Sequence, residues 1–437
     1  MAQHELFATG SGEAKPVDAA APAGDARLLR AERHQKRFEQ YCLDELVEQD
    51  HRVRMFARAL KRVDLSQFSE HFTARGGNAG RPAIDPEILI LLWLFATSES
   101  ISSARELARS CERDSVYRWI CGGVSVNHHT LSDFRTQHGK ALDALMTQLL
   151  GVFMSQGLVN LHRVAQDGMK VRAASGAASF HRKKSLKRAL KEARRHVMRM
   201  RAEAEDGSAG RTARERAAQL RSAQEAEENV MSALEELDRI ESAPRKSDSE
   251  PRVSTTDPQA RVMKMADGGF RPAYNVQIAS DTKSRMIVDI GVVQQGNDFG
   301  QAPPRMRAVQ QRTGVRPKEL LIDGGFAALA TIEELETSGM KVYAPVMHRK
   351  NARVERGKKR ATDSAAVGRW RRRMASKRAK KIYIERGAVA ESINGDLRRW
   401  RGLSAFNVRG IEKVSSVVLW SAITHNLIRW IALGGPQ

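Results

Sequence analysis

Cysteine is scarce in this chain of 437 residues, which contains only Cys42, Cys111 and Cys121. Three scattered thiols are too few for a disulfide framework or a four-cysteine zinc site, so we expect them to be reduced and structural. Long apolar runs are also missing. The longest in the N-terminal half, at 88–96, is far shorter than the ~20 residues of a membrane span. The polar first residues show no signal peptide, and together these absences predict a cytoplasmic protein without a membrane partner.

Acidic residues are outnumbered, with 51 Asp and Glu against 73 Lys and Arg, which gives a formal charge of +22. Such an excess favours a polyanionic partner and predicts binding to nucleic acid. A ribosomal or regulatory protein would also be basic.

Tyrosine is rare too. None of the five tyrosines lies among Arg and His residues, which counts against a recombinase with a nucleophilic tyrosine.

Three acidic residues lie in three unlike settings. Asp167 in VAQDGMKV and Asp323 in ELLIDGGFA end apolar, strand-like runs, and Glu391 opens a helical pattern in AVAESINGDLRRW. A fold could bring these carboxylates to one point, where they could hold two divalent cations roughly 3.5–4 Å apart. Such a site suits the cleavage and joining of phosphodiesters.

The sequence DGGF occurs twice, so the second carboxylate needs a choice. Asp323 follows an apolar run that can form a central strand, whereas Asp267 lies in polar KMADGGFRP. Asp323 is therefore the better candidate ligand. Asp298 in QQGND is the best reserve candidate and is expected to support the ligands rather than to replace one.

The surroundings of Glu391 resemble the C-terminal signature of the DDE transposases of bacterial insertion sequences. Tyr383, Arg386, Glu391 and Arg398 have its spacing, beginning at YIER. GRPAIDPEILILLWLF, HHTLSDFR, QDGMKVRA and STTDPQARVMKMADGGFRPAYNVQIA resemble other segments of the same family. The likeness covers most of the chain apart from its first residues and about 181–250. The family usually carries Lys where Arg398 stands, and Arg keeps the charge while adding a phosphate-matching fork.

This resemblance implies a transposase that binds terminal inverted repeats, cleaves the element ends by two-metal hydrolysis and joins the 3′-hydroxyls to target DNA. Asp167, Asp323 and Glu391 are then the catalytic residues and the ligands of two Mg²⁺ ions, which Mn²⁺ could replace. Tyr383 and the arginines of the signature would contact double-stranded DNA, and the protein would associate with the nucleoid. A homodimer or larger assembly is expected on paired ends. Two alternatives stay open: a catalytically inactive, transposase-derived DNA-binding protein, and a metal-dependent host nuclease of the same fold.

The N-terminal third is expected to be helical. Residues 1–30 are predicted to be a disordered tail, and residues 31–150 a helical DNA-binding domain with an N-cap at Asp85. One helix is expected to run from Ser102 to Gly122, and the next begins near HHTLSDFR. This pair resembles a helix-turn-helix, although an ordinary helical hairpin would have the same pattern. The candidate phosphate contacts are Arg105, Arg109, Arg113, Arg118 and Arg135.

Residues 151–437 are predicted to form a ribonuclease-H-like α/β domain, a mixed sheet flanked by helices. Asp-Gly is a strong hairpin signal, so a strand is expected to end at Asp167 and to return after Gly168. A charged helical hairpin at about 181–252 interrupts the domain and serves either as a solvated arm or as a contact to DNA or a second subunit. A basic stretch before Glu391, which includes Arg371 and Arg372, is expected to follow the DNA backbone.

Overall fold

The computed structural model describes residues 40–70, 82–206, 212–242, 250–346 and 358–435. The chain separates into two units, Met1–Cys42 and Leu43–Gln437. Every helix and strand named below lies in the second unit. The tail expected at 1–30 lies outside the described residues. No helix in the described ranges is long and apolar enough to cross a membrane.

The N-terminal part of the second unit is helical, and two short 3₁₀ turns, η1 and η2, accompany its α-helices. The elements are η1 (Leu43–Leu46), α1 (Arg52–Leu60), η2 (Ser66–Phe68), α2 (Pro86–Ser98), α3 (Ala104–Arg113), α4 (Ser115–Cys121), α5 (His128–Gln137) and α6 (Gly139–Ser155). The Asp85 carboxylate accepts a hydrogen bond from the Glu87 amide at 2.8 Å, with proline as the first helical residue. This confirms the predicted N-cap.

The single helix expected from Ser102 to Gly122 is wrong, because α3 and α4 are separated at Asp114. Asp114 has extended backbone angles, and its carboxylate accepts from the Val116 amide at 2.9 Å. Asp competes with helical hydrogen bonding in this way, so it caps a new helix better than it continues an old one. The expected end is correct, since Gly122 closes α4 in the left-handed conformation.

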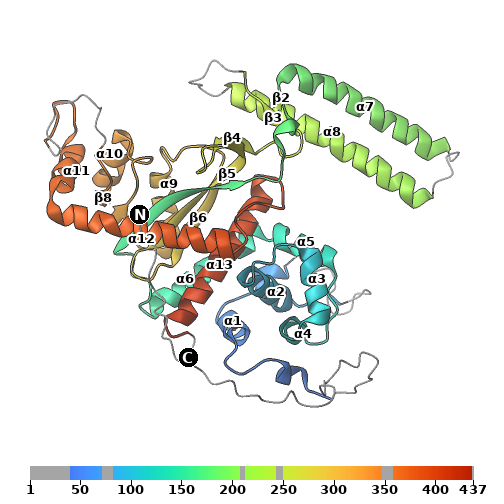
Figure 1. Cartoon of the computed structure of the whole chain (residues 1–437), viewed down its shortest axis with the longest axis horizontal. Coiled ribbons are helices and arrows are strands. Elements are labelled where there is room, and N and C mark those ends of the chain that lie inside the picture. Colours follow the sequence, from blue (N-terminus) through green and yellow to red (C-terminus); the bar gives the residue numbers. More distant parts are fainter. Residues whose placement is uncertain (1–39, 71–81, 207–211, 243–249, 347–357, 436–437) are drawn as a thin grey trace, which may run out of the picture. The chain divides into compact units, whose positions relative to one another are not determined.

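The centre of the unit is a mixed six-stranded sheet (Figure 1). Its strands run in the order β4–β5–β1–β7–β8, with β6 paired to the other half of β5. β1 is antiparallel to β5 and parallel to β7, and β7 is parallel to β8. The bounds are β1 (Arg163–Arg172), β4 (Arg261–Lys264), β5 (Phe270–Asp281), β6 (Ile287–Val293), β7 (Glu319–Leu321) and β8 (Lys341–Tyr343). β5 and β6 pair as an antiparallel hairpin, joined by a turn that follows Asp281.

The hairpin expected at Asp167 and Gly168 is wrong. β1 continues through both residues, which pair with Ile278 and Gln277 of β5. The structure explains why glycine occupies this strand interior. A β-carbon at position 168 would lie 2.2 Å from Oδ1 of Asp298, so the site has no room for a side chain. Here glycine marks a close approach rather than a turn.

Five helices accompany the sheet. They are α9 (Ala302–Thr313), α10 (Leu329–Thr337), α11 (Ala365–Ala375), α12 (Lys377–Trp400) and α13 (Ile411–Ala432). α12 contacts β1, and α13 packs against β6 and also against α2, α5 and α6 (Figure 1). Trp420 and Trp430 of α13 are buried, and the apolar cluster that holds them is continuous from α1 to α13. The N-terminal helices and the sheet therefore share one core.

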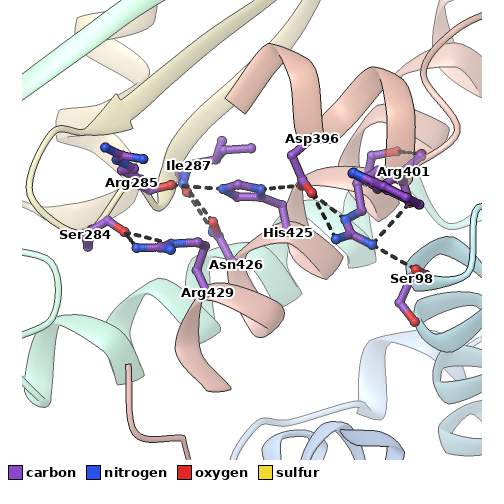
Figure 2. Close-up of polar contacts among 11 residues, drawn as sticks. Ser98, Ser284, Arg285, Ile287, Asp396, Arg401, His425, Asn426 and Arg429 are labelled. Carbon is purple, nitrogen blue, oxygen red and sulfur yellow. Dashed lines mark hydrogen bonds and ion pairs between the residues drawn. The ribbon is translucent and has the colours of Figure 1, made fainter. Parts of the chain in front are cut away.

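Polar contacts of His425 fix α13 to α12 and to the turn between β5 and β6 (Figure 2). The His425 ring contacts Asp396 of α12 at 2.7 Å and the Arg285 carbonyl of the β5–β6 turn at 2.9 Å. Arg401 pairs with Asp396 at 3.0 Å and donates to the Ser98 carbonyl at 2.9 Å. Burial opposes ionisation of Asp396, but hydrogen bonds from His425 and Arg401 lower its pKa below the usual range. His425 is a structural residue of the core, as the sequence predicts.

Two long helices, α7 (Lys183–Asp206) and α8 (Ala213–Ser242), lie side by side as an antiparallel pair (Figure 1). Short strands β2 (Phe180–His181) and β3 (Val253–Ser254) pair at their base, after the 3₁₀ turn η3 (Ala177–Ser179). A small separate core there contains Leu186, Leu237 and Val253. Glu236 of α8 pairs with Arg261 of β4, which ties this base to the sheet.

Candidate carboxylate site and basic surface

Asp167 and Asp323 come together because their strands are parallel neighbours. The pairing of β1 with β7 places Ala165 opposite Leu321, and each aspartate lies two residues further along its chain. Since side chains alternate, both aspartates project from the same face at the same edge. Burial raises the pKa of Asp167 above the usual range, Arg386 opposes this effect, and the negative charge of Asp323 adds to it. The two carboxylates therefore share one electrostatic environment.

Helix α12 covers Asp167 with two side chains. Asn394 donates to Oδ2 of Asp167 at 2.8 Å, and Nη1 of Arg386 lies 3.4 Å from its Oδ1. Nε of Arg386 is buried and makes no hydrogen bond. Asn394 is a residue that the sequence analysis missed, although it stands three positions after Glu391 and so on the same side of the helix. The carboxylate of Asp167 is held by an amide and by a cation.

Asp298 is a third carboxylate at this place. The side chains of Asn275 and Gln277, alternate residues on β5, donate to its Oδ1 at 2.8 and 2.6 Å. A β-carbon on Gly168 would lie 2.2 Å from that oxygen, and one on Gly325 would lie 3.7 Å from Oδ2. Asp298 thus lies between the glycines that follow the two strand aspartates. From the sequence, Asp298 is only a reserve candidate for the site. The glycines after Asp167 and Asp323 are the sequence signal that another group approaches closely here.

Glu391 stands apart from these carboxylates. It is exposed on α12, between the two residues that contact Asp167. Within the described ranges, no three His, Cys, Asp or Glu side chains are grouped closely enough to hold a metal ion. The structure therefore brings Asp167 and Asp323 together and places Glu391 on the adjacent helix. Arg398, seven residues after Glu391, is exposed and donates to the Lys170 carbonyl of β1 at 3.4 Å.

Tyr383 lies beside the aspartate pair and is half-buried. Burial raises the pKa of its hydroxyl, a hydrogen bond and the charge of Arg386 oppose that shift, and the charges of Asp323 and Asp167 add to it. These four residues form one electrostatic group. Of the four signature residues, Tyr383 and Arg386 therefore lie beside the aspartate pair.

Two of the arginines predicted to contact DNA, Arg371 and Arg135, are buried and already paired, which corrects their assignment. Nε and Nη2 of Arg371 donate to the carboxylate of Asp363 at 2.7 and 3.2 Å, and both residues are buried. Arg135 is 9 % exposed, donates to the Ser102 carbonyl at 2.6 Å and stacks on Trp93. Sequence alone shows charge but not direction, and every third or fourth position of a basic helix faces inward.

Other basic residues, on α3, α11 and α12, face solvent. They are Arg105, Arg109 and Arg113 of α3, Arg369 and Arg372 of α11, and Lys377, Arg378, Lys380 and Lys381 of α12. We call the exposed cations of α11 and α12 the α11–α12 basic surface; they precede Tyr383 and Arg386 in the chain.

Gly168→Ala is expected to lower the free energy of unfolding by about 1–3 kcal/mol, the usual effect of an overpacked position. The added methyl group would collide with Asp298 and approach Nε2 of Gln277 to 2.9 Å. Gly151→Ala in α6 is the matched control, because its new β-carbon meets no atom within 4 Å. Urea denaturation of both variants measures the effect. Equal stability of Gly168→Ala and wild type would mean that Asp298 is free to move away.

Comparison with known protein families identifies two regions. Residues 41–137 match a family described as a transposase domain (DUF772), and residues 248–427 match the transposase DDE domain. The second region includes Asp323 and Glu391 but begins after Asp167. No curated protein and no solved structure matches the chain. The two matched regions together cover more than half of the sequence, and the chain belongs to the DDE transposases of insertion sequences.

Proposed function

We propose that this transposase binds the terminal inverted repeats of its element, cleaves the DNA at both ends by metal-dependent hydrolysis and joins the freed 3′-hydroxyls to target DNA. The observation that carries the proposal is the pairing of Asp167, within β1, with Asp323, just after the parallel neighbour β7, beside the helix that bears Glu391. Three antiparallel strands joined to two parallel ones support a ribonuclease-H-like fold for residues 151–437. That fold is known for carboxylates at neighbouring strand ends.

DDE transposases use divalent metal ions, and the donor atoms here fit one. The groups are carboxylate oxygens, which hard cations such as Mg²⁺ and Mn²⁺ prefer. Burial raises the pKa of Asp167 and the nearby charge of Asp323 adds to this effect, while Arg386 opposes it at 3.4 Å. We assign Asp167, Asp323 and Glu391 as ligands of two Mg²⁺ ions, with Asp298 as their closest support. The ions would supply Lewis-acid activation of the scissile phosphate and of water.

The protein's own side chains position the DNA. Asn394 fixes one oxygen of Asp167 and thereby the direction of the other. Arg386 and Arg398, on either side of Glu391, offer forked donors that match phosphate oxygens. Tyr383, hydrogen-bonded to Arg386, orients that guanidinium. The α11–α12 basic surface, which includes Arg372, would contact the DNA backbone that leads to the scissile phosphate.

DNA binding by the helical region at 31–150 is supported by the exposed arginines of α3. Two element ends must meet in one complex for paired joining, so we expect a homodimer or larger assembly on DNA. The helical pair α7 and α8 is available for contacts to DNA or to a second subunit. Its first helix is strongly basic, which suits either surface.

The test is cleavage and joining in vitro. Purified protein, Mg²⁺ and a duplex that carries the inverted repeats flanking the gene should yield nicks with 3′-hydroxyl ends and then products joined to plasmid DNA. Sequence-specific binding without any nick in Mg²⁺ or Mn²⁺ would instead support the inactive, DNA-binding alternative. Cleavage of any duplex, with no preference for the repeats and no joining, would support a nuclease.

A further inference from the structure

A cavity of about 460 Å³ lies between the N-terminal helices and the segment that joins α12 to α13. Its walls come from α2, the start of α3, α5 and residues 407–408. Its polar lining includes Ser102, Arg105, His128, Arg135 and Asn407, and none of the residues that line it is acidic. Its volume is that of a typical small-ligand site.

Arg135 contributes a buried cation without a compensating charge. Its Nη1 donates to the Ser102 carbonyl and its guanidinium stacks on Trp93 at 4.6 Å, while Nε is buried and makes no hydrogen bond. Burial lowers the pKa of Arg135 to about 10, so the group still carries its charge at neutral pH. A buried and unsatisfied cationic donor is unfavourable unless an anion completes it.

Two helices also begin at this cavity. Ser103 caps α3 through the Glu106 amide, and Asn127 caps α5 through the Thr130 amide. Among the described residues, the cap side chains bond the amides of Glu106 and Thr130 and not those at 104–105 and 128–129. First-turn amides and the positive end of the helix dipole favour an anion at such a position.

We propose that this cavity binds a phosphate group, held by Arg105, His128 and Arg135. The inference rests on the proposed function for its most direct source, a backbone phosphate of DNA. Free phosphate has the same chemistry and is the other source. The site is separate from the aspartate pair and uses none of its residues.

An occupant would connect the helical region to the helix that carries Glu391. The Asn407 side chain donates to Ser102 Oγ at 3.0 Å, and the Ser100 hydroxyl donates to the Arg399 carbonyl at 3.4 Å. The segment between α2 and α3 is thus hydrogen-bonded to the end of α12 and to the segment that joins α12 to α13. A phosphate at Ser102 and Arg105 would contact this bonded segment.

Phosphate titration tests the site. With chloride at equal ionic strength as the reference, ³¹P spectra of inorganic phosphate should show saturable binding to the wild-type chain. Arg105→Gln and His128→Gln should each weaken it about tenfold, as expected for loss of a charge-assisted bond. Arg113→Gln, an exposed residue of α3 outside the cavity, is the matched control and should bind like wild type. Circular dichroism confirms folding, and these variants spare Arg135, whose replacement could disturb the core.

The second measurement is the affinity of each variant for a duplex that carries the repeats. If DNA is the source, Arg105→Gln should lose about tenfold in affinity against about twofold for Arg113→Gln, and added phosphate should compete. Unchanged duplex affinity with lost phosphate binding would assign the cavity to free phosphate. Saturable phosphate binding by a chain that binds no DNA would preserve this site and refute the proposed function. Equal phosphate binding by all variants, or none by wild type, would overturn the inference.

Discussion

Asp167→Asn is expected to abolish cleavage of element-end DNA, with a fall of at least on the order of 10³ in rate, while binding of that DNA stays nearly intact. Removal of a ligand withdraws several kcal/mol of charge stabilisation, and each 1.36 kcal/mol is about tenfold. Asp323→Asn and Glu391→Gln should behave alike. The measurements are single-turnover cleavage of a labelled end duplex and its affinity in Ca²⁺.

Asp267→Asn is the matched control, since this residue opens the other DGGF sequence. Asp267 is exposed and pairs with the exposed Arg271, so its replacement should leave cleavage unchanged. Asp298→Asn decides between two roles: a loss as large as that of Asp167→Asn makes it a ligand, and a smaller loss makes it a support. Any of the three proposed ligands that can be replaced at the wild-type rate does not belong to the site.

Heat denaturation gives a second readout that does not depend on activity. Because the folded pKa of Asp167 is raised, its contribution to stability is fully present below the ordinary carboxyl pKa and is lost as pH rises through the folded value. At neutral pH without divalent cations, Asp167→Asn should therefore be at least as stable as wild type. Added Mg²⁺ should raise the melting temperature of wild type only. A variant that gains equally from Mg²⁺ would place the cation elsewhere.

The elements of this fold were largely predictable, because apolar periodicity and caps are local signals. The start of α2 at Asp85, the β5–β6 hairpin and the strand before Asp323 follow from such signals. Asp167 shows where prediction from local sequence signals fails. The same Asp-Gly pair that makes hairpins stands here inside β1, because Asp298, 130 positions away from Gly168, occupies the space of its side chain. A local pattern cannot contain that contact.

The direction in which a side chain points also could not be predicted from the sequence. Arg371 and Arg372 are neighbours in one basic run, yet the first is buried on Asp363 and the second faces solvent. Arg135 was expected on the surface and instead lines a cavity beside Trp93. Helix position decides these outcomes, and it depends on where the apolar face of each helix lies in the tertiary structure. The spacing of Tyr383 and Arg386 was informative because both residues lie beside Asp167 and Asp323.

Affinity for end-containing DNA is expected to fall steeply with salt. Each phosphate neutralised by the protein contributes about −0.9 to the slope of log affinity against log salt, so about six contacts would cost on the order of 10³ in affinity between 50 and 200 mM. The exposed cations of α3 and of the α11–α12 basic surface are sufficient in number for this. Fluorescence anisotropy of a labelled duplex across that range measures the slope.

The α11–α12 basic surface should account for a defined part of this response. Arg372→Gln combined with Arg378→Gln should reduce the slope by about two contacts, or roughly 1.8, since both side chains are exposed. Arg271→Gln removes an exposed charge that is already paired with Asp267, so it should leave the slope nearly unchanged. If the double variant keeps the wild-type slope, these arginines do not contact phosphates. If the affinity of wild type for DNA does not change with salt, the positively charged residues of this chain do not bind DNA phosphates.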